Sequence, residues 1–545
     1  MISKKAKEVA FKLFLYETMD AHNMKKFYIT TPIFYANAEL HLGHTYTLVL
    51  ADILARYHRA LEENTFFLTG MDEHGAKIVR AAQKADTGPQ DFVNGHATKF
   101  QTLLDNLSIS NDFFIRTSDQ KHHWHGATKL WRALEESGDI YKGNYQGLYC
   151  VGCEAFVTEK ELVNGKCPHH DTEPEKIDEQ NYFFRLSRYT PELKRLIESK
   201  ELLITPATKA NEMLALLDVR GSENYVGDIS ISRPEGQIPW GIPVPGDPSQ
   251  LMYVWCDALA NYLSALGYGQ KDDENFSLFW PPDVQVMGKD IIRFHALLWP
   301  AMLLSAKLAL PKEILVHGFV TSGGRKMSKS IGNVLVPADF LEEYGVDALR
   351  YYFAREVAPT DDWDLTREKF KEVYNANLAN GLGNLVSRTL KMAEQYFAGR
   401  VEGTVAESLP LRTHHAPMFE SGDLAGFNIP YIATNNILPR YHAHMKAHEI
   451  NKAADVVWEF IGKLDQYVTD YEPFKLIKTD PATAEKVIWA LIYGLQEVAH
   501  MTEPFIPEAS QKIQMLIGSS VAGEKEGSLV FFTKAPLAPL FMRKE

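Results

Sequence analysis

Residues 27–75 read FYITTPIFYANAELHLGHTYTLVLADILARYHRALEENTFFLTGMDEHG, and this stretch decides the fold. Its first part, FYITT, is a β-branched and aromatic run that predicts a buried strand ending at Pro32. The apolar residues of 45–61 recur at helical spacing, and TFFLT at 65–69 predicts a second strand that ends at Gly70. A strand, a helix and a strand in this order form a βαβ unit. The fold class is therefore α/β, with a parallel sheet and a right-handed crossover.

Ligands of such sheets bind beyond the carboxyl ends of the strands. The two loops that follow the predicted strands, at 32–44 and 70–75, are therefore the first places to look for a site. Further strand and helix patterns resume at 253–265, 284–287 and 291–304, which predicts that the sheet continues there.

The composition excludes several classes of protein. The chain has 545 residues, of which 45% are hydrophobic and 23% charged, as in folded multi-domain proteins. Its net charge of −13 means that a nucleic acid would be held by local basic patches rather than by bulk charge. The longest apolar run, 296–305, is too short to span a bilayer, so no membrane partner is expected. Four cysteines are too few for a disulfide framework and predict a reducing, cytoplasmic location.

The pattern changes along the chain in a way that predicts several domains. Residues 1–23 form an amphipathic stretch that carries acidic residues and lacks the features of a secretory signal, so we expect an extension without a functional role. Cysteines and short aromatic strands mark an insertion, and long amphipathic helices dominate after Leu365, apart from a loop around 399–428. The expected boundaries are 1–23 (extension), 24–137 (first half of the sheet domain), 138–247 (insertion), 248–312 (second half), 313–368 (a connecting region) and 369–545 (helical bundle).

Two short motifs carry the chemistry. His41-Leu42-Gly43-His44 falls where the first strand passes into the first helix, and the free N–H groups of a helix start attract phosphate. Two surface histidines at a helix start would give the same pattern, so this motif alone is weak. The second motif, KMSKS at 326–330, follows a glycine hinge and suits a mobile clamp for polyphosphate oxygens. A solvated basic loop is the alternative, but the joint occurrence of both motifs strongly favours nucleotide chemistry.

These two motifs resemble the HIGH and KMSKS signatures of the class I aminoacyl-tRNA synthetases. The segments TPIFYAN (31–37), GMDEHG (70–75), YVWCDAL (253–259) and GKDI (288–291) are similar to the methionyl-tRNA synthetase family within that class. The resemblance runs from about Lys25 to beyond Pro507. It implies a class I Rossmann-like parallel sheet with a zinc-bearing insertion, followed by an all-α anticodon-binding bundle, with the region at 313–368 contacting the tRNA stem.

The resemblance also implies roles for individual residues. The implied phosphate and pyrophosphate ligands, which are the catalytic residues, are His41, His44, Lys326 and Lys329. The implied ATP site consists of these four with Gly43, Gly288 and Asp290, where Asp290 holds the ribose. The implied methionine site contains Ile33, Tyr35, Trp255, Ala258, Leu259, Tyr262 and His295, and Asp72 receives the α-ammonium group. Aromatic edges suit a thioether and a carboxylate suits a cationic amine, although Trp255 and Tyr262 could equally be core residues.

The cysteines indicate a metal site independently of this resemblance. Cys150 and Cys153 form a C-x2-C knuckle, and after thirteen intervening residues Cys167 and His170 form C-x2-H. Three thiolates and one imidazole suit one closed, tetrahedral, structural Zn²⁺ site. Two alternatives remain at this point: His169 could replace His170, and the cysteines could be buried without metal.

In the helical tail, Asn377, Arg388 and Trp458 match positions that contact the anticodon in the family. Unpaired bases are bound by aromatic stacking and by hydrogen bonds to their edges, which these side chains can supply. Trp458 could instead be an interhelical core residue. Phe474 stands where many relatives carry tryptophan.

The resemblance implies ATP-dependent attachment of methionine to tRNA(Met) through a methionyl-adenylate, with Mg²⁺ bound to ATP. Synthetases for leucine, isoleucine and valine are less suitable, because an insertion of about 110 residues at 138–247 is too short for their editing domain. A cysteinyl enzyme would scatter its zinc ligands around the active site. A silent RNA-binding descendant and a small-molecule nucleotidyltransferase remain as rivals. No appended oligonucleotide-binding domain is recognisable after the bundle, so a monomer is expected.

Overall fold

The computed structural model describes residues 25–37, 40–150, 155–157, 159, 162–168, 171–218, 227–236, 240–326, 335–411, 428–518, 520–523 and 527–545. The chain divides into two compact units. One contains 25–59 and 63–319, and the other contains 60–62 and 320–545. The amphipathic stretch at 1–23 lies outside the described residues.

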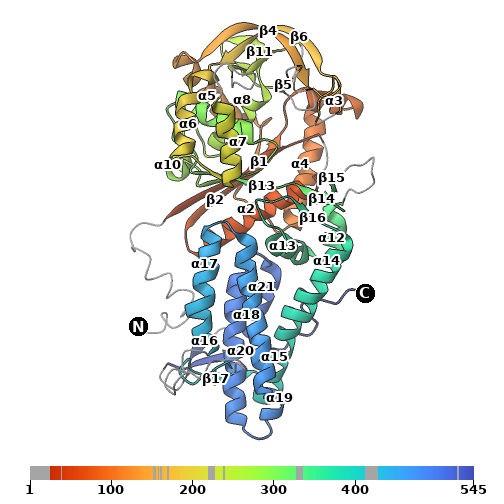
Figure 1. Ribbon diagram of the computed structural model, residues 1–545, viewed down its shortest axis with the longest axis vertical. Helices are drawn as coiled ribbons and strands as arrows, with labels where there is room; N and C mark the ends of the chain where they lie inside the picture. Colours follow the sequence, from red (N-terminus) through yellow and green to blue (C-terminus); the bar gives the residue numbers. More distant parts are fainter. Residues whose placement is uncertain are drawn as a thin grey trace. The chain divides into compact units, whose positions relative to one another are not determined.

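A six-stranded parallel sheet organises the first unit (Figure 1). Its spatial order is β3-β2-β1-β12-β13-β7, and every neighbouring pair is parallel. This confirms the α/β fold class. The strands are β1 (Lys26–Tyr35), β2 (Asn64–Asp72), β3 (Phe113–Arg116), β7 (Leu203–Thr205), β12 (Val284–Gly288) and β13 (Glu313–His317).

The predicted βαβ unit is present, with one correction at Pro32. The strand β1 continues to Tyr35, and the register against β2 shifts between Thr30 and Ile33. Proline has no N–H to give to the ladder, so a bulge absorbs Pro32 instead of ending the strand. The connecting helix α2 (Leu42–Ala60) is buried along most of its length, which explains why its sequence is apolar on more than one face.

Further helices connect and cover the strands of this unit. The segment at 253–265 contains two short helices that are separated at Ala260. The segment at 291–304 starts with a π-helical turn that leads into α11. The helices and turns are α3 (Ala76–Lys84), α4 (Pro89–Asn106), η1 (Gln120–Trp124), α5 (His125–Glu136), α6 (Thr190–Glu198), α7 (Ala207–Leu217), α8 (Val254–Leu259), α9 (Asn261–Ser264), α10 (Glu274–Phe279), η4 (Phe294–Leu298) and α11 (Trp299–Ser305).

The insertion contains an antiparallel sheet, as its short aromatic strands indicate. The long hairpin of β4 (Ile140–Cys150) and β6 (Glu175–Phe184) carries β5 (Ala155–Val157) and β8 (Ile229–Ser230) at its edges. A smaller sheet contains β9 (Ser232–Pro234), β10 (Pro243–Val244) and β11 (Asp247–Met252). However, β7 also falls within 138–247 and pairs with β13 as an edge strand of the main sheet. The insertion is therefore interleaved with the sheet domain rather than wholly separate from it.

The second unit begins with a small sheet and continues as helices. Its first sheet contains β14 (Val320–Ser322), β15 (Arg325–Lys326) and β16 (Trp363–Asp364). The long helices α15, α18 and α20 pack side by side (Figure 1). The helices are α12 (Pro337–Tyr344), α13 (Val346–Arg355), α14 (Arg367–Val373), the π-helical η5 (Tyr374–Gly383), α15 (Asn384–Phe397), α16 (Ile429–Ile432), η7 (Ala433–Ile437), α17 (Leu438–Lys446), α18 (Ile450–Tyr471), α19 (Pro473–Leu476), α20 (Pro481–Thr502) and α21 (Pro507–Ile517).

One part of this unit was not anticipated from the sequence. The strands β17 (Arg400–Gly403), β19 (Leu529–Phe532) and β18 (Val521–Ala522) form a small antiparallel sheet. The first of them lies inside the segment expected to be a loop at 399–428, of which 412–427 lie outside the described residues. No helix in the described part of the chain is long and apolar enough to cross a membrane.

Acid should destabilise the helical unit through His442. Burial lowers the pKa of His442 on α17 to about 4, with a smaller contribution from Lys446. A lowered folded-state pKa gives stability above the unfolded pKa of about 6.5, which is lost as the pH falls towards 4. The free energy of unfolding should fall between pH 7 and pH 4.5. We expect this fall to be about 2 kcal/mol smaller in His442→Gln than in the unmutated protein. Urea unfolding of both proteins at the two pH values measures this. Equal pH dependence in the two proteins would contradict it.

Candidate active site

The strand order of the main sheet locates the site. The chain runs outward from β1 through β2 to β3, and later from β12 through β13, so the order reverses between β1 and β12. Such a switch point opens a crevice at the carboxyl ends of the two strands. The residues at these ends are Tyr35 of β1 and Gly288 of β12. Both belong to the predicted site.

The two motif histidines lie at the start of α2, next to this crevice. Their rings stack with centroids 3.8 Å apart. The Gly43 N–H donates to Nδ1 of His41 at 3.0 Å, and the His41 N–H donates to Nδ1 of His44 at 3.3 Å. Because each Nδ1 accepts a hydrogen bond, a neutral ring carries its proton on Nε2. Each imidazole therefore keeps Nε2–H as a donor for a ligand.

Both histidines are neutral near pH 7. Burial holds the pKa of His44 well below its usual value, and the neighbouring His41 and His317 lower it further. Desolvation also lowers the pKa of His41, while the Asp290 carboxylate partly offsets this. Two neutral donors at a helix N-terminus can approach phosphate oxygens together, whereas two stacked imidazolium ions would repel each other.

The carboxyl ends of β12 and β13 form the neighbouring wall. Gly288 pairs with His317, and a Cβ at Gly288 would lie 2.8 Å from Oδ1 of Asp290. Only glycine therefore allows the Asp290 carboxylate to lie against the strand end. His317 donates from Nδ1 to the Gly318 carbonyl at 2.8 Å, and its Nε2 lies 2.7 Å from the Thr47 hydroxyl of α2. His317 thus ties α2 to this wall.

The residues expected around methionine come from five segments, and the structure gathers them beside the crevice. Tyr35 pairs with Asp72 across β1 and β2. The side chains of Ile33 and Tyr35 pack against the same hydrophobic cluster that contains Trp255, Leu259 and Tyr262. Ala258 is buried on α8 and lies between Trp255 and Leu259 in the sequence. The rings of Trp255 and Phe294 stack at 3.7 Å, and His295 meets Trp255 edge-on at 6.3 Å.

His295 and Tyr262 form a buried polar pair in this cluster. Burial lowers the pKa of His295 to about 4, so the ring is neutral near pH 7. Its Nδ1 donates to the Ile291 carbonyl at 3.1 Å, which leaves Nε2 to accept from the Tyr262 hydroxyl at 2.8 Å. The Tyr262 oxygen keeps lone pairs that can face a weakly polar group such as a thioether.

Comparison with known proteins agrees with this geometry. The family of class I tRNA synthetases (M) matches residues 27–179 and 160–390, and the anticodon binding domain of methionyl tRNA ligase matches 431–526. The methionine–tRNA ligase of Thermotoga maritima is 40% identical over 493 residues, covering 90% of this chain and 74% of the relative. That of Brucella suis is 38% identical over 493 residues, covering 90% of this chain and 91% of the relative.

Solved structures give the same result. The Mycobacterium tuberculosis methionyl-tRNA synthetase in complex with methionyl-adenylate superimposes with a TM-score of 0.85 at 36% identity, covering 95% of this chain and 100% of that one. The chain belongs to the methionyl-tRNA synthetase family. As expected of this family, an α/β sheet domain precedes a helical unit.

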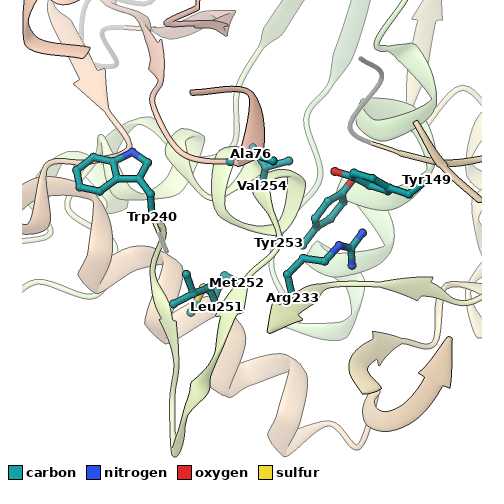
Figure 2. Close-up of a pocket in the computed structure, with 9 residues that line it drawn as sticks. Ala76, Tyr149, Arg233, Trp240, Leu251, Met252, Tyr253 and Val254 are labelled. Atoms are coloured by element: carbon teal, nitrogen blue, oxygen red, sulfur yellow. The ribbon is translucent and has the colours of Figure 1, made fainter. Parts of the chain in front are cut away.

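A pocket in the first unit involves several residues that the sequence did not single out (Figure 2). It is lined by Gly75 and Ala76, Tyr149, Arg233, Trp240, and the segment 251–254. The buried Arg233 guanidinium lies 4.3 Å from the centre of the Tyr253 ring and 5.2 Å from that of Tyr149. Arg233 also donates to the Ser230 hydroxyl at 2.8 Å and to the Ser232 carbonyl at 2.7 Å. The local pattern of β9 does not reveal the two rings, because they come from β4 and from the residue between β11 and α8.

The proposed zinc ligands are only partly described. Cys150 at the end of β4 and Cys167 are both buried. Cys167 is held in a tight turn, because its carbonyl accepts from Asp171 N–H at 2.8 Å and its N–H donates to Thr172 at 2.9 Å. Such a turn suits a metal knuckle. Cys153, His169 and His170 lie outside the described residues. Among the residues that the structure describes, no group of three potential metal ligands is found.

The remaining predicted residues lie in the second unit. Lys326 is on β15, whereas Lys329 lies outside the described residues. Asn377 is on η5, and Arg388 on α15 forms an ion pair with Asp465. Trp458 of α18 is 7% exposed, lies 4.6 Å from the Tyr351 ring and donates to the Asn377 carbonyl at 3.4 Å. Trp458 is therefore largely packed among its neighbours, with a small part of its surface exposed, whereas Phe474 is 44% exposed.

Proposed function

We propose that the crevice between β1 and β12 is where this chain activates methionine with ATP before transferring it to tRNA(Met). The observation that carries this proposal is the pair of stacked, neutral histidines at the start of α2, beside Gly288 and Asp290. Membership of the methionyl-tRNA synthetase family supplies the overall reaction, and the geometry supports the assignment of roles.

In the first step the methionine carboxylate, already ionised near pH 7, attacks the α-phosphorus of ATP in line with the leaving pyrophosphate. An oxygen–phosphorus bond forms, the bond to the β-phosphate oxygen breaks, and methionyl-adenylate results. No protein nucleophile or base is required, so catalysis is positioning together with stabilisation of charge on the phosphate oxygens. His41 and His44 donate from Nε2 to these oxygens, and Asp290 accepts from the ribose hydroxyls.

Methionine itself is held at two ends. The Asp72 carboxylate accepts from the α-ammonium group, and the aromatic set of Tyr35, Trp255 and Tyr262 surrounds the thioether. The neutral state of His295 supports this role, because a buried imidazolium next to an apolar side chain would require a counter-charge. Ile33, Ala258 and Leu259 complete the apolar wall.

Lys326 and Lys329 supply positive charge for the pyrophosphate, and Mg²⁺ bound to ATP would supply further positive charge to the phosphate oxygens. In the second step the 2′-hydroxyl of the terminal adenosine attacks the methionyl carbonyl and AMP leaves. Asn377, Arg388 and Trp458 remain our proposal for the anticodon contact, with the helical unit as the region that carries it. We further propose a monomer in the cytoplasm, where four cysteines would stay reduced.

A structural Zn²⁺ ion at Cys150, Cys153, Cys167 and His170 would cross-link the two knuckles of the insertion. We expect Cys167→Ser to lower the zinc content from about one ion per chain to near zero, because a hydroxyl is a far weaker zinc ligand than a thiolate. Elemental analysis of the purified proteins measures this. Cys256→Ser, in a buried position outside the knuckles, is the matched control and should keep its zinc. Equal zinc contents in the two variants would contradict the assignment.

The proposed activity is tested by amino-acid-dependent ATP–pyrophosphate exchange with all twenty amino acids. Exchange with methionine alone is expected. Exchange with a different amino acid would overturn the pocket assignment but keep the reaction type. No exchange by folded protein would favour a non-enzymatic RNA-binding role, the one alternative that family membership leaves open.

A further inference from the structure

A buried hydrogen-bonded chain connects the two halves of the methionine site. Nδ1 of His74 donates to Oδ2 of Asp257 at 2.6 Å, and Nε2 of His123 donates to Oδ1 of the same carboxylate at 2.7 Å. The Ser264 hydroxyl lies 2.8 Å from Nδ1 of His123. The four side chains come from the loop after β2, from η1, from α8 and from α9.

This hydrogen-bonded set of four side chains is inaccessible to substrates. The side chains of Asp257 and His123 are 0% exposed, and that of His74 is 3% exposed. Burial alone would raise the pKa of the Asp257 carboxyl, but the two imidazoles more than compensate and lower it. Asp257 is therefore ionised, with both oxygens used. The serine, histidine and aspartate cannot act on a ligand as a nucleophilic triad, so their effect must pass through the segments they join.

Those segments carry the two ends of the methionine site. His74 is two residues after Asp72, and Asp257 is two residues after Trp255. Glu73, between Asp72 and His74, has partners of its own. Arg116 donates to the Glu73 carboxylate at 2.6 Å, and the Glu73 N–H donates to the Thr117 hydroxyl at 2.9 Å. The loop that presents Asp72 is thus fixed by bonds on both sides. Functional groups need such support, because small displacements weaken a binding site.

We propose that Asp257 is a positioning residue which, through His74 and His123, sets the separation between the Asp72 carboxylate and the Trp255 wall for methionine. This inference rests on the proposed function of the crevice. It assigns to Asp257, His74 and His123 an effect on the amino acid side of the reaction and not on the nucleotide side. In the part of the protein that the structure describes, these hydrogen bonds join His74, Asp257, His123 and Ser264 to one another and reach neither 41–44 nor 288–290.

The test uses isosteres that match the two imidazole nitrogens. Asparagine places a donor near Nδ1 of a histidine, so His74→Asn can keep the bond to Asp257, whereas His74→Ala cannot. Asp257→Asn removes the negative charge and replaces one acceptor oxygen with a donor, so the bond on that side persists only if the imidazole there changes its tautomer. We expect the KM for methionine in pyrophosphate exchange to rise about tenfold in His74→Ala and Asp257→Asn, and less than threefold in His74→Asn. The KM for ATP should stay within about twofold in all three.

The matched control is Asp139→Asn. Asp139 is also a buried carboxylate of the same unit and accepts from Arg188 and Ser305, both at 2.8 Å, but it lies on none of the methionine segments. It should lower Tm and leave the KM for methionine unchanged. An unchanged KM in Asp257→Asn, a parallel rise for ATP, or the same rise in Asp139→Asn would each overturn the proposal. If Asp257→Asn fails to fold, the pair His74→Ala and His74→Asn decides. Absence of methionine-dependent exchange in the unmutated protein would instead refute the proposed function.

Discussion

Replacing His44 with alanine is expected to slow methionyl-adenylate formation by about two to three orders of magnitude. The ring is a neutral donor whose Nδ1 already accepts from the His41 N–H, so its Nε2–H is the group that remains for phosphate. The hydrogen bond from this Nε2–H stabilises the transition state most, when charge develops on the α-phosphate, because the helix start is pre-organised and needs no rearrangement. The loss should therefore appear in the rate of the chemical step rather than in methionine affinity.

Single-turnover formation of the adenylate measures this directly. His44→Gln retains an amide N–H near the position of Nε2 and should recover part of the rate. His125→Asn, at an exposed position at the start of α5, serves as a control and should behave like the unmutated protein. A His44→Ala protein with normal single-turnover rates, or a defect that appears only as weaker methionine binding, would remove His44 from the phosphate site.

The sequence predicted the first strands of the sheet and the helix between them well because these depend on local signals. The β-branched strand β1, the helix α2 and the strand β2 each follow from the spacing of their own residues. The bulge at Pro32 did not follow, since the strand is continued by ladder bonds to β2 on both sides of it. The edge strand β7 was missed for a similar reason. Three residues, Leu203–Thr205, become a strand only because β13 offers a free edge.

The supporting residues of the site could not be predicted in the same way. His317 ends β13 and has no motif around it, but a hydroxyl from α2, distant in sequence, lies 2.7 Å from its ring. The chain of His74, Asp257 and His123 joins residues separated by 183 and 134 positions. Trp458 shows the converse case, because an aromatic residue on a helix pattern does not reveal whether it faces a core or a ligand. Such long-range partners are set by topology and not by local pattern.

Replacing Asp72 with asparagine is expected to raise the KM for methionine by about tenfold to a hundredfold, because a neutral amide loses the charge-assisted bonds to an ammonium group. Asp72 is buried at the end of β2 opposite Tyr35, so the lost charge cannot be replaced by water at no cost. Methioninol keeps the ammonium group but lacks the carboxylate. The affinity of Asp72→Asn for methioninol should be lower than that of the unmutated protein by a similar factor. Asp91→Asn, in the first turn of α4, is the exposed control. An unchanged affinity of Asp72→Asn for methioninol would show that Asp72 does not bind the ammonium group.

The double variant Asp72→Asn/Asp257→Asn then separates direct contact from positioning. Two independent contributions to methionine binding would multiply, so that the double variant would show the product of the two single effects. If Asp257 acts by holding Asp72 in place, its contribution largely disappears once Asp72 can no longer bind the ammonium group. The double variant should therefore have a KM close to that of Asp72→Asn alone. Full multiplication of the two effects would mean that Asp257 supports the Trp255 wall independently of Asp72.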